Sequence, residues 1–331
     1  MKIKLSELKA VTKKAILHYG YTEAEAEVLM EVMLYAQLRG NNQGVVKLIG
    51  KGIPKNKNVT PAKAEKESKL SAFFDGGHNH AMVAVKFATD EAVKKAKESG
   101  VAVVGIHNLN TSSGALGYYA HTIAQAGLVG IVMCGSMETV AAAGSYEAMF
   151  GTNPIAIAVP TAGEPMVFDM TTSAMAFFGV VEANTAGRML PSGIAYDKAG
   201  NATVKPADVL DGGALKTFDG SHKGSGLSMM IQALTGPLLN SYFTGIGDVA
   251  NNWAGHLIIA FDPELFGGVQ AMREGVTAMI GRVKAAKKLP GVNEIFVPGE
   301  HGDRKTHEIE KSGELEIEEN LYNELKKVAG E

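Results

Sequence analysis

Apolar side chains near both ends of the chain recur at the three- and four-residue spacing of amphipathic helices. The first predicted helix would be capped by Ser6 and ended by Gly20. The second would start at a capping box formed by Thr22 and Glu25 and end before Gly40. Their apolar faces contain Leu8, Val11, Ala15, Ile16, Leu29, Val32, Met33, Ala36 and Leu38. The helical period returns over residues 268–288 and 321–328, so helices are expected at both ends of the chain.

Short continuous apolar runs replace this period in the middle of the chain and are typical of buried strands. The predicted strands are residues 101–106, 129–134, 154–159, 166–169 and 256–261. Helices are predicted between them over residues 115–126 and 224–235, and the second of these would place Met229 and Met230 in the core. The Lys- and Pro-rich residues 51–69 are expected to form an exposed connection. This pattern predicts an α/β body between helix-rich ends.

Composition narrows the class of protein. The 331 residues suggest two domains, and the formal charge of −3 argues against a nucleic-acid-binding protein. A single cysteine, Cys134, excludes an intrachain disulfide and a Cys-rich metal site. No apolar run approaches the ~18 residues that span a bilayer, and the first residues do not form a signal peptide. We therefore expect a soluble, cytoplasmic protein without a metal.

Standard nucleotide-binding motifs are missing. The sequence has no G-x-x-x-x-G-K-[ST] loop, and its one G-x-G-x-x-A match, at Gly245, Gly247 and Ala250, follows no apolar strand. A match in that context is expected to be accidental.

Two polar clusters precede residue 115. The first runs from Arg39 to Gly44 and includes Lys47 just downstream, so its amides and cations suit a carboxylate, although a solvated turn has the same composition. The second spans residues 107–114 and opens the helix predicted at 115–126. Free N–H groups there suit an anion, and an ordinary helix cap is an equal alternative.

Two further clusters lie later in the chain. Residues 151–154 and 168–173 place hydroxyls and Asp169 at strand ends, where a ligand crevice is plausible, but Asp169 can equally cap the next helix. Residues 221–226 combine Lys223 with Gly-Ser-Gly at a predicted helix start, which resembles a phosphate-binding site.

Together these segments resemble the type-2 malate/L-lactate dehydrogenase family, whose members include 2-hydroxy-acid dehydrogenases and cyclic-imine carboxylate reductases. The resemblance extends from about Lys4 to Leu325 and rests on the order and spacing of several matching stretches. These stretches are residues 39–40, 113–119, 151–154, 168–170, 223–226 and 297–299. The resemblance implies NAD or NADP bound without a Rossmann domain, and a homodimer. It implies a mixed-sheet NAD(P)-binding domain, residues 71–261, inserted into a helical domain made of residues 1–70 and 262–331. The implied cofactor contacts are Ser136, Asp169, Met170, Thr171, His222, Lys223, Gly299, Glu300 and His301.

The sequence departs from the family where the substrate would bind. Family members usually carry Ser-His-Gly and a downstream Arg, whereas this chain has Asn42-Gln43-Gly44 and then Lys47. A second usual histidine is replaced by Thr111 or Ser112. Reduction of a ketone by hydride leaves an alkoxide that an acid must protonate, and Gln43 can only hydrogen-bond.

Three functions therefore stay open. The main one is a dehydrogenase that transfers hydride between the nicotinamide and C2 of a small 2-oxo or 2-hydroxy carboxylate with a replacement acid. The second is reduction of a cyclic 2-imino carboxylate, whose iminium form already carries its proton. The third is a protein that binds nucleotide and catalyses little. The candidate catalytic residues are Gln43, Lys47, His107 and Ser112, and the candidate substrate-binding residues are Arg39, Asn42 and Thr111.

Overall fold

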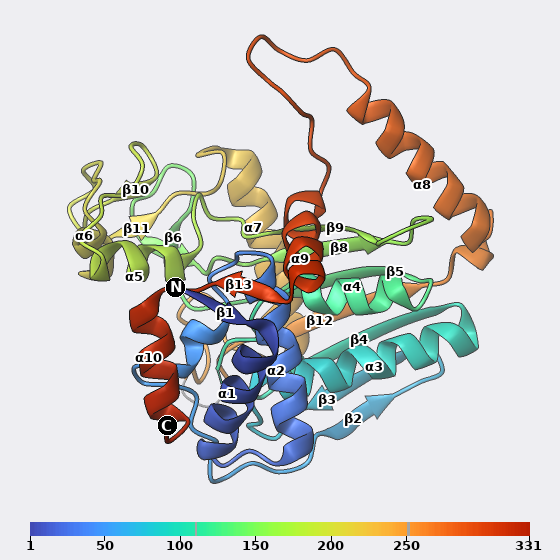
Figure 1. Ribbon diagram of the computed structural model, residues 1–331, viewed down its shortest axis with the longest axis horizontal. Helices are drawn as coiled ribbons and strands as arrows, with labels where there is room; N and C mark the ends of the chain where they lie inside the picture. Colours follow the sequence, from blue (N-terminus) through green and yellow to red (C-terminus); the bar gives the residue numbers. More distant parts are fainter. Residues whose placement is uncertain (110, 250–251) are drawn as a thin grey trace.

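A seven-stranded mixed sheet forms the centre of the computed structural model, which describes residues 1–109, 111–249 and 252–331 (Figure 1). In spatial order its strands are β2 (Lys63–Glu67), β3 (Ser71–Asp75), β4 (Val101–His107), β12 (His256–Phe261), β5 (Val129–Cys134), β8 (Ile155–Val159) and β9 (Met166–Met170). Only β3 and β4 pair in parallel; the other neighbours are antiparallel. The mixed α/β class predicted from the sequence is confirmed.

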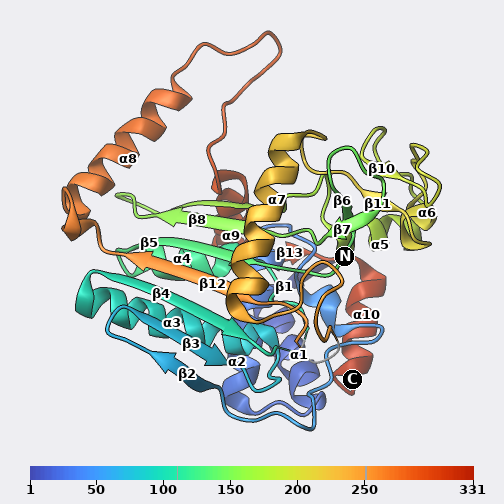
Figure 2. The ribbon, with the colours of Figure 1, turned by 180° about the vertical axis from the view of Figure 1, so that it is seen from behind.

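Helices cover both faces of this sheet. The parallel pair β3–β4 requires a crossover, which is α3 (Ala81–Ser99). With α4 (Gly117–Gln125), α3 packs on one face, and α7 (His222–Thr235) lies on the opposite face (Figure 2). The buried positions of the strands are mostly Ala, Val and Ile, which fit the close approach of sheet and helix.

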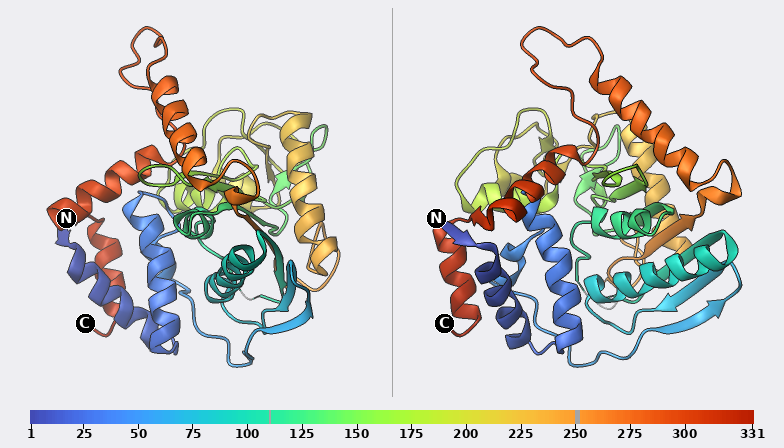
Figure 3. Two further views of the ribbon diagram at one scale, coloured as in Figure 1. Left: turned by 90° about the vertical axis from the view of Figure 1, so that its right-hand side faces the viewer. Right: turned by 45° about the vertical axis from the view of Figure 1, so that its right-hand side comes forward.

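The two ends of the chain pack against each other. Strand β1 (Lys2–Lys4) pairs with β13 (Glu314–Glu316), and the N-terminal amine donates to the carbonyl of Ile317 at 2.8 Å. Around this contact lie α1 (Leu5–His18), α2 (Glu23–Leu38), α9 (Glu300–Ser312) and α10 (Glu319–Val328). Both termini therefore lie on the same side of the molecule (Figure 3).

A smaller unit stands beside the large sheet and has its own apolar cluster. It consists of the four strands β10 (Ala195–Tyr196), β11 (Ala214–Leu215), β6 (Val140–Ala141) and β7 (Ala148–Phe150), with α5 (Phe177–Thr185) and α6 (Pro206–Leu210). Single-turn 3₁₀ helices complete the fold: η1 (Val45–Leu48), η2 (Pro237–Leu239) and η3 (Pro263–Leu265).

An arm made of residues 262–299 projects from the body and contains α8 (Val269–Lys284) (Figures 1 and 3). Helix α8 has no buried residue, although its sequence is amphipathic. Among the described residues, no helix combines the length and hydrophobicity needed to cross a bilayer.

Several local predictions need correction. The methionines of α7 are not in the core: Met229 and Met230 are 62% and 58% exposed, because Ser228, Ile231 and Gln232 form the buried face. The first helix begins at Leu5 with no side-chain cap, so Ser6 is not its cap. The capping box of Thr22 and Glu25 is confirmed.

The connection predicted over residues 51–69 is partly a strand. Its last residues form β2, an edge strand whose exposed charged side chains discourage pairing with another chain. The G-x-G-x-x-A match lies in the loop before β12, and its Ala250 lies outside the described residues.

The packing of α10 on α1 predicts that the last turns of the chain stabilise the fold. Leu325 is completely buried, so Leu325→Ala should lower the free energy of unfolding by about 2–5 kcal/mol through lost burial and a residual cavity. Chemical denaturation followed by circular dichroism measures this change. Asn323→Ala, an exposed substitution on the same helix, is the control and should shift stability by less than about 0.5 kcal/mol. Equal effects of the two variants would show that α10 does not pack as described.

Candidate active site

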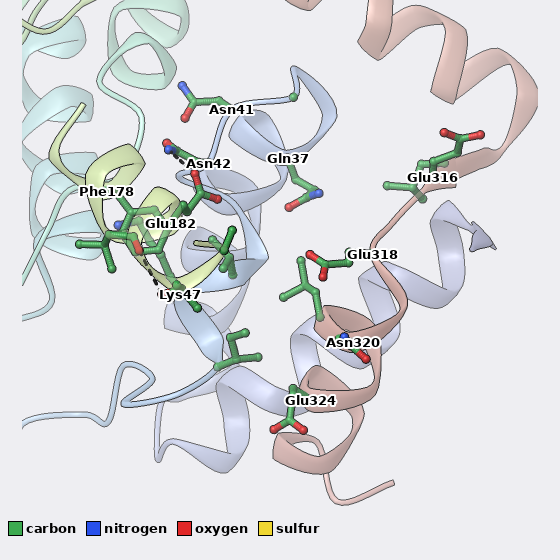
Figure 4. Close-up of a pocket in the computed structure, with 18 of the residues that line it drawn as sticks. Gln37, Asn41, Asn42, Lys47, Phe178, Glu182, Glu316, Glu318, Asn320 and Glu324 are labelled. Carbon is green, nitrogen blue, oxygen red and sulfur yellow. Dashed lines mark hydrogen bonds between the residues drawn. The ribbon is translucent and has the colours of Figure 1, made fainter. Parts of the chain in front are cut away.

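A large open cavity of about 1400 Å³ separates the N- and C-terminal segments from α5. In Figure 4, Asn42, Lys47, Phe178 and Glu182 form one wall, and Glu316, Glu318, Asn320 and Glu324 form the other. The basic residues that also line the cavity are Lys2, Lys51, Arg188 and Lys305. The polar residues His80, Thr111 and Ser112 line it as well.

The parallel pairing of β3 and β4 brings two of these segments together. Parallel strands end at the same edge of a sheet, so the chain leaves both strands side by side. The amide of Gly76 donates to the carbonyl of His107 at 2.8 Å, and that of His78 donates to the carbonyl of Asn108 at 2.9 Å. His80 follows the first segment, and Thr111 with Ser112 follows the second.

The short helix η1 delivers Lys47 to the cavity. Val45 and Leu48, at the i and i+3 positions of a 3₁₀ turn, are completely buried, which leaves Val46 and Lys47 facing the cavity. The Nζ of Lys47 lies 3.4 Å from the Oγ of Ser112 and 5.6 Å from the centre of the Phe178 ring. No carboxylate of the described residues forms an ion pair with it. Burial without a counter-charge lowers the pKa of Lys47 to about 8.

His80 lies beside this lysine and is 6% exposed. It is the N-cap of α3, and its Nδ1 accepts the amide proton of Met82 at 3.2 Å. An imidazole whose Nδ1 accepts carries its proton on Nε2 when neutral. Burial first, and the charge of Lys47 second, lower the pKa of His80 to about 3, so the ring is neutral at physiological pH.

Thr111 and Ser112 complete this end of the cavity. The hydroxyl of Thr111 is buried and has no hydrogen-bond partner among the described residues. Its φ of 77° lies in the left-handed region, which is strained for a β-branched residue by about 1–3 kcal/mol. The Oγ of Ser112 also accepts the amide proton of Gly114 at 3.2 Å, which holds the loop against the start of α4.

The stretch after α2 contacts α5. Asn42 donates through Nδ2 to Glu182 at 3.0 Å, and Gln43 donates through Nε2 to the Oδ1 of Asn42 at 3.4 Å. Phe178 and Glu182 are one helical turn apart on α5, so both lie on the same wall of the cavity as Lys47, as Figure 4 shows. Gln43 is not among the residues that line the cavity.

Two candidate residues are held elsewhere. Arg39 forms an ion pair with Asp303 of α9 at 2.7 Å, and its guanidinium lies 3.7 Å above the Tyr35 ring. His107 stacks on Phe73 with ring centres 4.7 Å apart, and its Nε2 lies 3.1 Å from a Glu65 oxygen. The structure therefore groups Asn42, Lys47, Thr111 and Ser112, and it does not bring Arg39 or His107 to them.

Several of the expected cofactor-binding residues are linked to one another by a series of hydrogen bonds. The hydroxyls of Ser136 and Thr152 are 3.3 Å apart, and the carbonyl of Thr152 accepts the amide proton of Thr172 at 2.8 Å. Thr171 and Ser173 are linked through their hydroxyls at 3.0 Å. The series continues as the carbonyl of Thr172 accepts from Phe218, next to the start of α7. The ends of β5 and β9 thus meet the N-terminus of α7.

The N-terminus of α7 is already capped by its own chain. The amide of Gly224 donates to the carboxylate of Asp219 at 3.2 Å, and that of Lys223 donates to the hydroxyl of Ser221 at 3.1 Å. Hydrogen bonds from the hydroxyl and then the amide of Ser221, together with that of Gly224, lower the pKa of Asp219 to about 2 and keep it ionised. The amides expected to bind a phosphate are therefore engaged, and the exposed side chains of His222 and Lys223 are the donors that remain.

The other cofactor candidates lie near β9. Asp169 accepts the amide proton of Gly117 at 2.7 Å, so it caps α4, an earlier helix, rather than the next one. Desolvation of the carboxyl group raises the pKa of Asp169 to about 6 against the opposing hydrogen bond from Gly117, although the residue as a whole is exposed. Met170 is the last residue of β9, and Gly299 packs against the β9 backbone at Val167.

Glu300 and His301 follow Gly299 in the first turn of α9. Glu300 pairs with Lys284 and with Arg304, the latter at 3.3 Å, and the His301 ring lies edge-on to Phe296 at 5.5 Å. Both residues thus contact the base of the arm.

Sequence reasoning missed His80, Phe178 and Glu182. His80 precedes a helix that the periodicity did not reveal, because α3 buries many alanines and presents a weak apolar stripe. Phe178 and Glu182 have the i, i+4 spacing of one helix face, but nothing in the sequence indicates what that face contacts. The described residues contain no group of three or more His, Cys, Asp or Glu side chains placed to hold a metal ion.

Known proteins share this architecture. A family model described as malate/L-lactate dehydrogenase matches residues 3–326. Ureidoglycolate dehydrogenase (NAD(+)) of Escherichia coli O157:H7 is 32% identical over 98% of this chain and 95% of its own length. The Delta(1)-pyrroline-2-carboxylate/Delta(1)-piperideine-2-carboxylate reductase of Pseudomonas putida is 33% identical over 100% and 97% of the two chains.

A solved structure extends this similarity to three dimensions. Sulfolactate dehydrogenase from Methanocaldococcus jannaschii superposes with a TM-score of 0.84 at 30% identity, covering 100% of this chain and 97% of that one. The chain therefore belongs to the malate/L-lactate dehydrogenase family of oxidoreductases.

Proposed function

We propose that this protein is an NAD(P)-dependent oxidoreductase that interconverts a small 2-oxo carboxylate and its 2-hydroxy form, with Lys47 as the proton donor. The observation that carries the proposal is a partly buried lysine without a counter-charge, hydrogen-bonded to Ser112 in the cavity. The names of relatives from the same family, which act on ureidoglycolate and on cyclic imino carboxylates, support this substrate class.

The residues at the ends of β5 and β9 fit a dinucleotide. Their hydroxyls, at Ser136, Thr152 and Thr171, are donors suited to ribose and phosphate oxygens. At the start of α7, His222 adds an imidazole and Lys223 adds a cation. We propose that these groups, together with Asp169, Met170 and residues 299–301, hold NAD or NADP. The bound nicotinamide supplies or accepts the hydride.

Lys47 supplies the proton in this proposal. With a pKa of about 8 its ammonium is the main form at neutral pH, yet it loses a proton far more readily than an ordinary lysine. Ser112 holds the Nζ toward the loop after β4, and the Phe178 ring lies on the α5 side of it. When C2 of the substrate accepts hydride, the ammonium passes a proton to the C2 oxygen, and in oxidation the neutral amine takes it back.

Reduction of a cyclic 2-imino carboxylate is the second candidate. The observation that favours it is the pairing of Phe178 and Glu182 on the wall that carries Lys47, because an aromatic face and a carboxylate both stabilise an iminium cation. An iminium needs no proton from Lys47, so the two candidates differ in their dependence on pH.

We also propose that the protein works as a cytoplasmic homodimer. The arm exposes a row of large apolar side chains: Leu265, Phe266, Met279, Val283, Leu289, Val292 and Phe296. The sheet exposes Val103 and Phe168 on its strands. Patches of this kind mark contact surfaces, and a second copy of the chain offers both halves of the contact. We propose in addition that residues 71–261 form an NAD(P)-binding domain inserted into a helical domain made of residues 1–70 and 262–331.

The proposal predicts the pH dependence of ketone reduction. A group whose pKa is about 8 is protonated below that pH, so kcat/KM for a 2-oxo carboxylate should be constant from pH 6 to about 7.5 and fall about tenfold per unit above 8. Lys47→Met should reduce kcat by roughly 10²–10⁴-fold, because the general acid is lost. The absorbance of NAD(P)H reports the rate.

Two further variants test this assignment. Lys47→Arg keeps the charge but cannot release a proton, so activity should stay low and the fall above pH 8 should disappear. Lys51→Met removes an exposed lysine that lines the same cavity and should change the rate less than about threefold. A flat profile with an imino carboxylate would favour the second candidate, and no NAD(P)H oxidation with any 2-oxo or 2-imino acid would refute both.

The exposed apolar side chains of the arm lead us to expect a dimer that forms in a concentration-dependent way. The double variant Met279→Glu/Val283→Glu places two charges on the exposed apolar side of α8 and should convert the dimer to a monomer without unfolding it. Sedimentation velocity at several protein concentrations measures the change. Arg282→Glu alters an exposed charge of the same helix and should leave the dimer intact; a double variant that stays dimeric would place the interface elsewhere.

A further inference from the structure

Three hydrogen-bond donors among the residues that line the cavity, at Lys47, His80 and Thr111, lack an acceptor of matching strength. The Lys47 ammonium has one long contact, to Ser112. The Thr111 hydroxyl is buried and has no partner among the described residues, and the hydrogen bond that His80 forms uses Nδ1, not Nε2. Buried donors are normally satisfied, so this arrangement is typical of a site that takes its acceptor from a ligand.

We propose that His80 and Thr111 bind the substrate's carboxylate. His80 donates its Nε2–H to one carboxylate oxygen, and Thr111 donates its hydroxyl proton to the other. The inference rests on the proposed function, because it takes the substrate to be a carboxylate reduced beside Lys47. It adds His80, which has no recognisable motif around it in the sequence, to the residues that touch the substrate.

The charges around the cavity favour this end for an anion. The cation at Lys47 lies next to His80, whereas Glu316, Glu318 and Glu324 line the far wall (Figure 4). Lys47 therefore attracts a carboxylate to its end of the cavity. Glu182 on the same wall already accepts a hydrogen bond from Asn42, and the other cations of the lining are Lys2, Lys51, Arg188 and Lys305. A neutral donor is useful here, because a second cation beside Lys47 would lower the pKa of that lysine further.

Arg39, the obvious carboxylate binder in the sequence, is already engaged. Its ion pair with Asp303 and its stacking on Tyr35 occupy the guanidinium, and Asp303 also fixes α9 against α2. Using Arg39 for the substrate would require that ion pair to break. His80 and Thr111 have no ion pair to break, and the N-cap contact with Met82 fixes the orientation of the His80 ring.

Two substitutions separate binding by His80 from its capping of α3. His80→Asn keeps a good N-cap acceptor for the Met82 amide but removes the donor at the Nε2 position. His80→Gln weakens the cap but places an amide N–H near that position. Thr111→Val removes the hydroxyl while keeping the β-branched shape, and Thr111→Ser keeps the hydroxyl.

The measurement is the affinity for oxamate, a carboxylate that resembles a 2-oxo acid and is not reduced, by calorimetry with and without NADH. His80→Asn and Thr111→Val should each weaken oxamate binding by about 10- to 100-fold, which is the effect of losing a hydrogen bond to a charged group. His80→Gln and Thr111→Ser should stay within about threefold of the parent. Oxamide, the neutral analogue, should bind weakly to all of them.

Steady-state kinetics give a second readout. In His80→Asn and Thr111→Val, KM for the oxo acid should rise by the factor by which oxamate binding weakens. The fall in rate above pH 8 should persist, because Lys47 is unchanged. Unchanged oxamate affinity and KM in folded His80→Asn protein would overturn the inference and leave the role of Lys47 standing. If the unmodified protein shows no fall in rate above pH 8, the proposed function is overturned. Oxamate binding that depends on His80 would in that case still support the carboxylate-binding role of His80.

Discussion

The parallel pairing of β3 with β4 is the constraint on which the candidate active site depends. A parallel pair needs a crossover helix, and α3 fills that role with His80 as its N-cap. The same pairing makes both strands end at one edge of the sheet, where the backbones of residues 76–78 and 107–108 hydrogen-bond to each other. Every other pair of neighbouring strands in this sheet is antiparallel, so β3 and β4 are the pair in it whose carboxyl ends are adjacent.

The second determinant is an uncompensated cation. A buried lysine is costly unless it is paired, and Lys47 has no carboxylate partner among the described residues. Its position is fixed by Val45 and Leu48, whose burial anchors η1. The hydrophobic core thus holds a charged group where folding alone does not favour it, which is a common property of functional sites. The strained backbone at Thr111 in the same cavity agrees with this view.

The sequence predicted the elements that carry a strong local signal. The capping box at Thr22 and Glu25 and the apolar strands β4, β5, β8 and β12 follow from local chemistry and were predicted within a few residues. Helix α3 was missed because its buried positions are mainly alanines, whose small size weakens the periodic pattern. The exposure of Met229 and Met230 was missed because an apolar side chain does not indicate which face of a helix is covered.

The sequence by itself determined the family and the mixed α/β class, because these are properties of residues in order along the chain. Tertiary structure decided which polar groups share a cavity. It set Arg39 against Asp303 and His107 against Glu65, and it brought His80 beside Lys47 from a segment some thirty residues away. Such contacts depend on strand order and helix packing, which involve residues distant in sequence, and no local pattern encodes them.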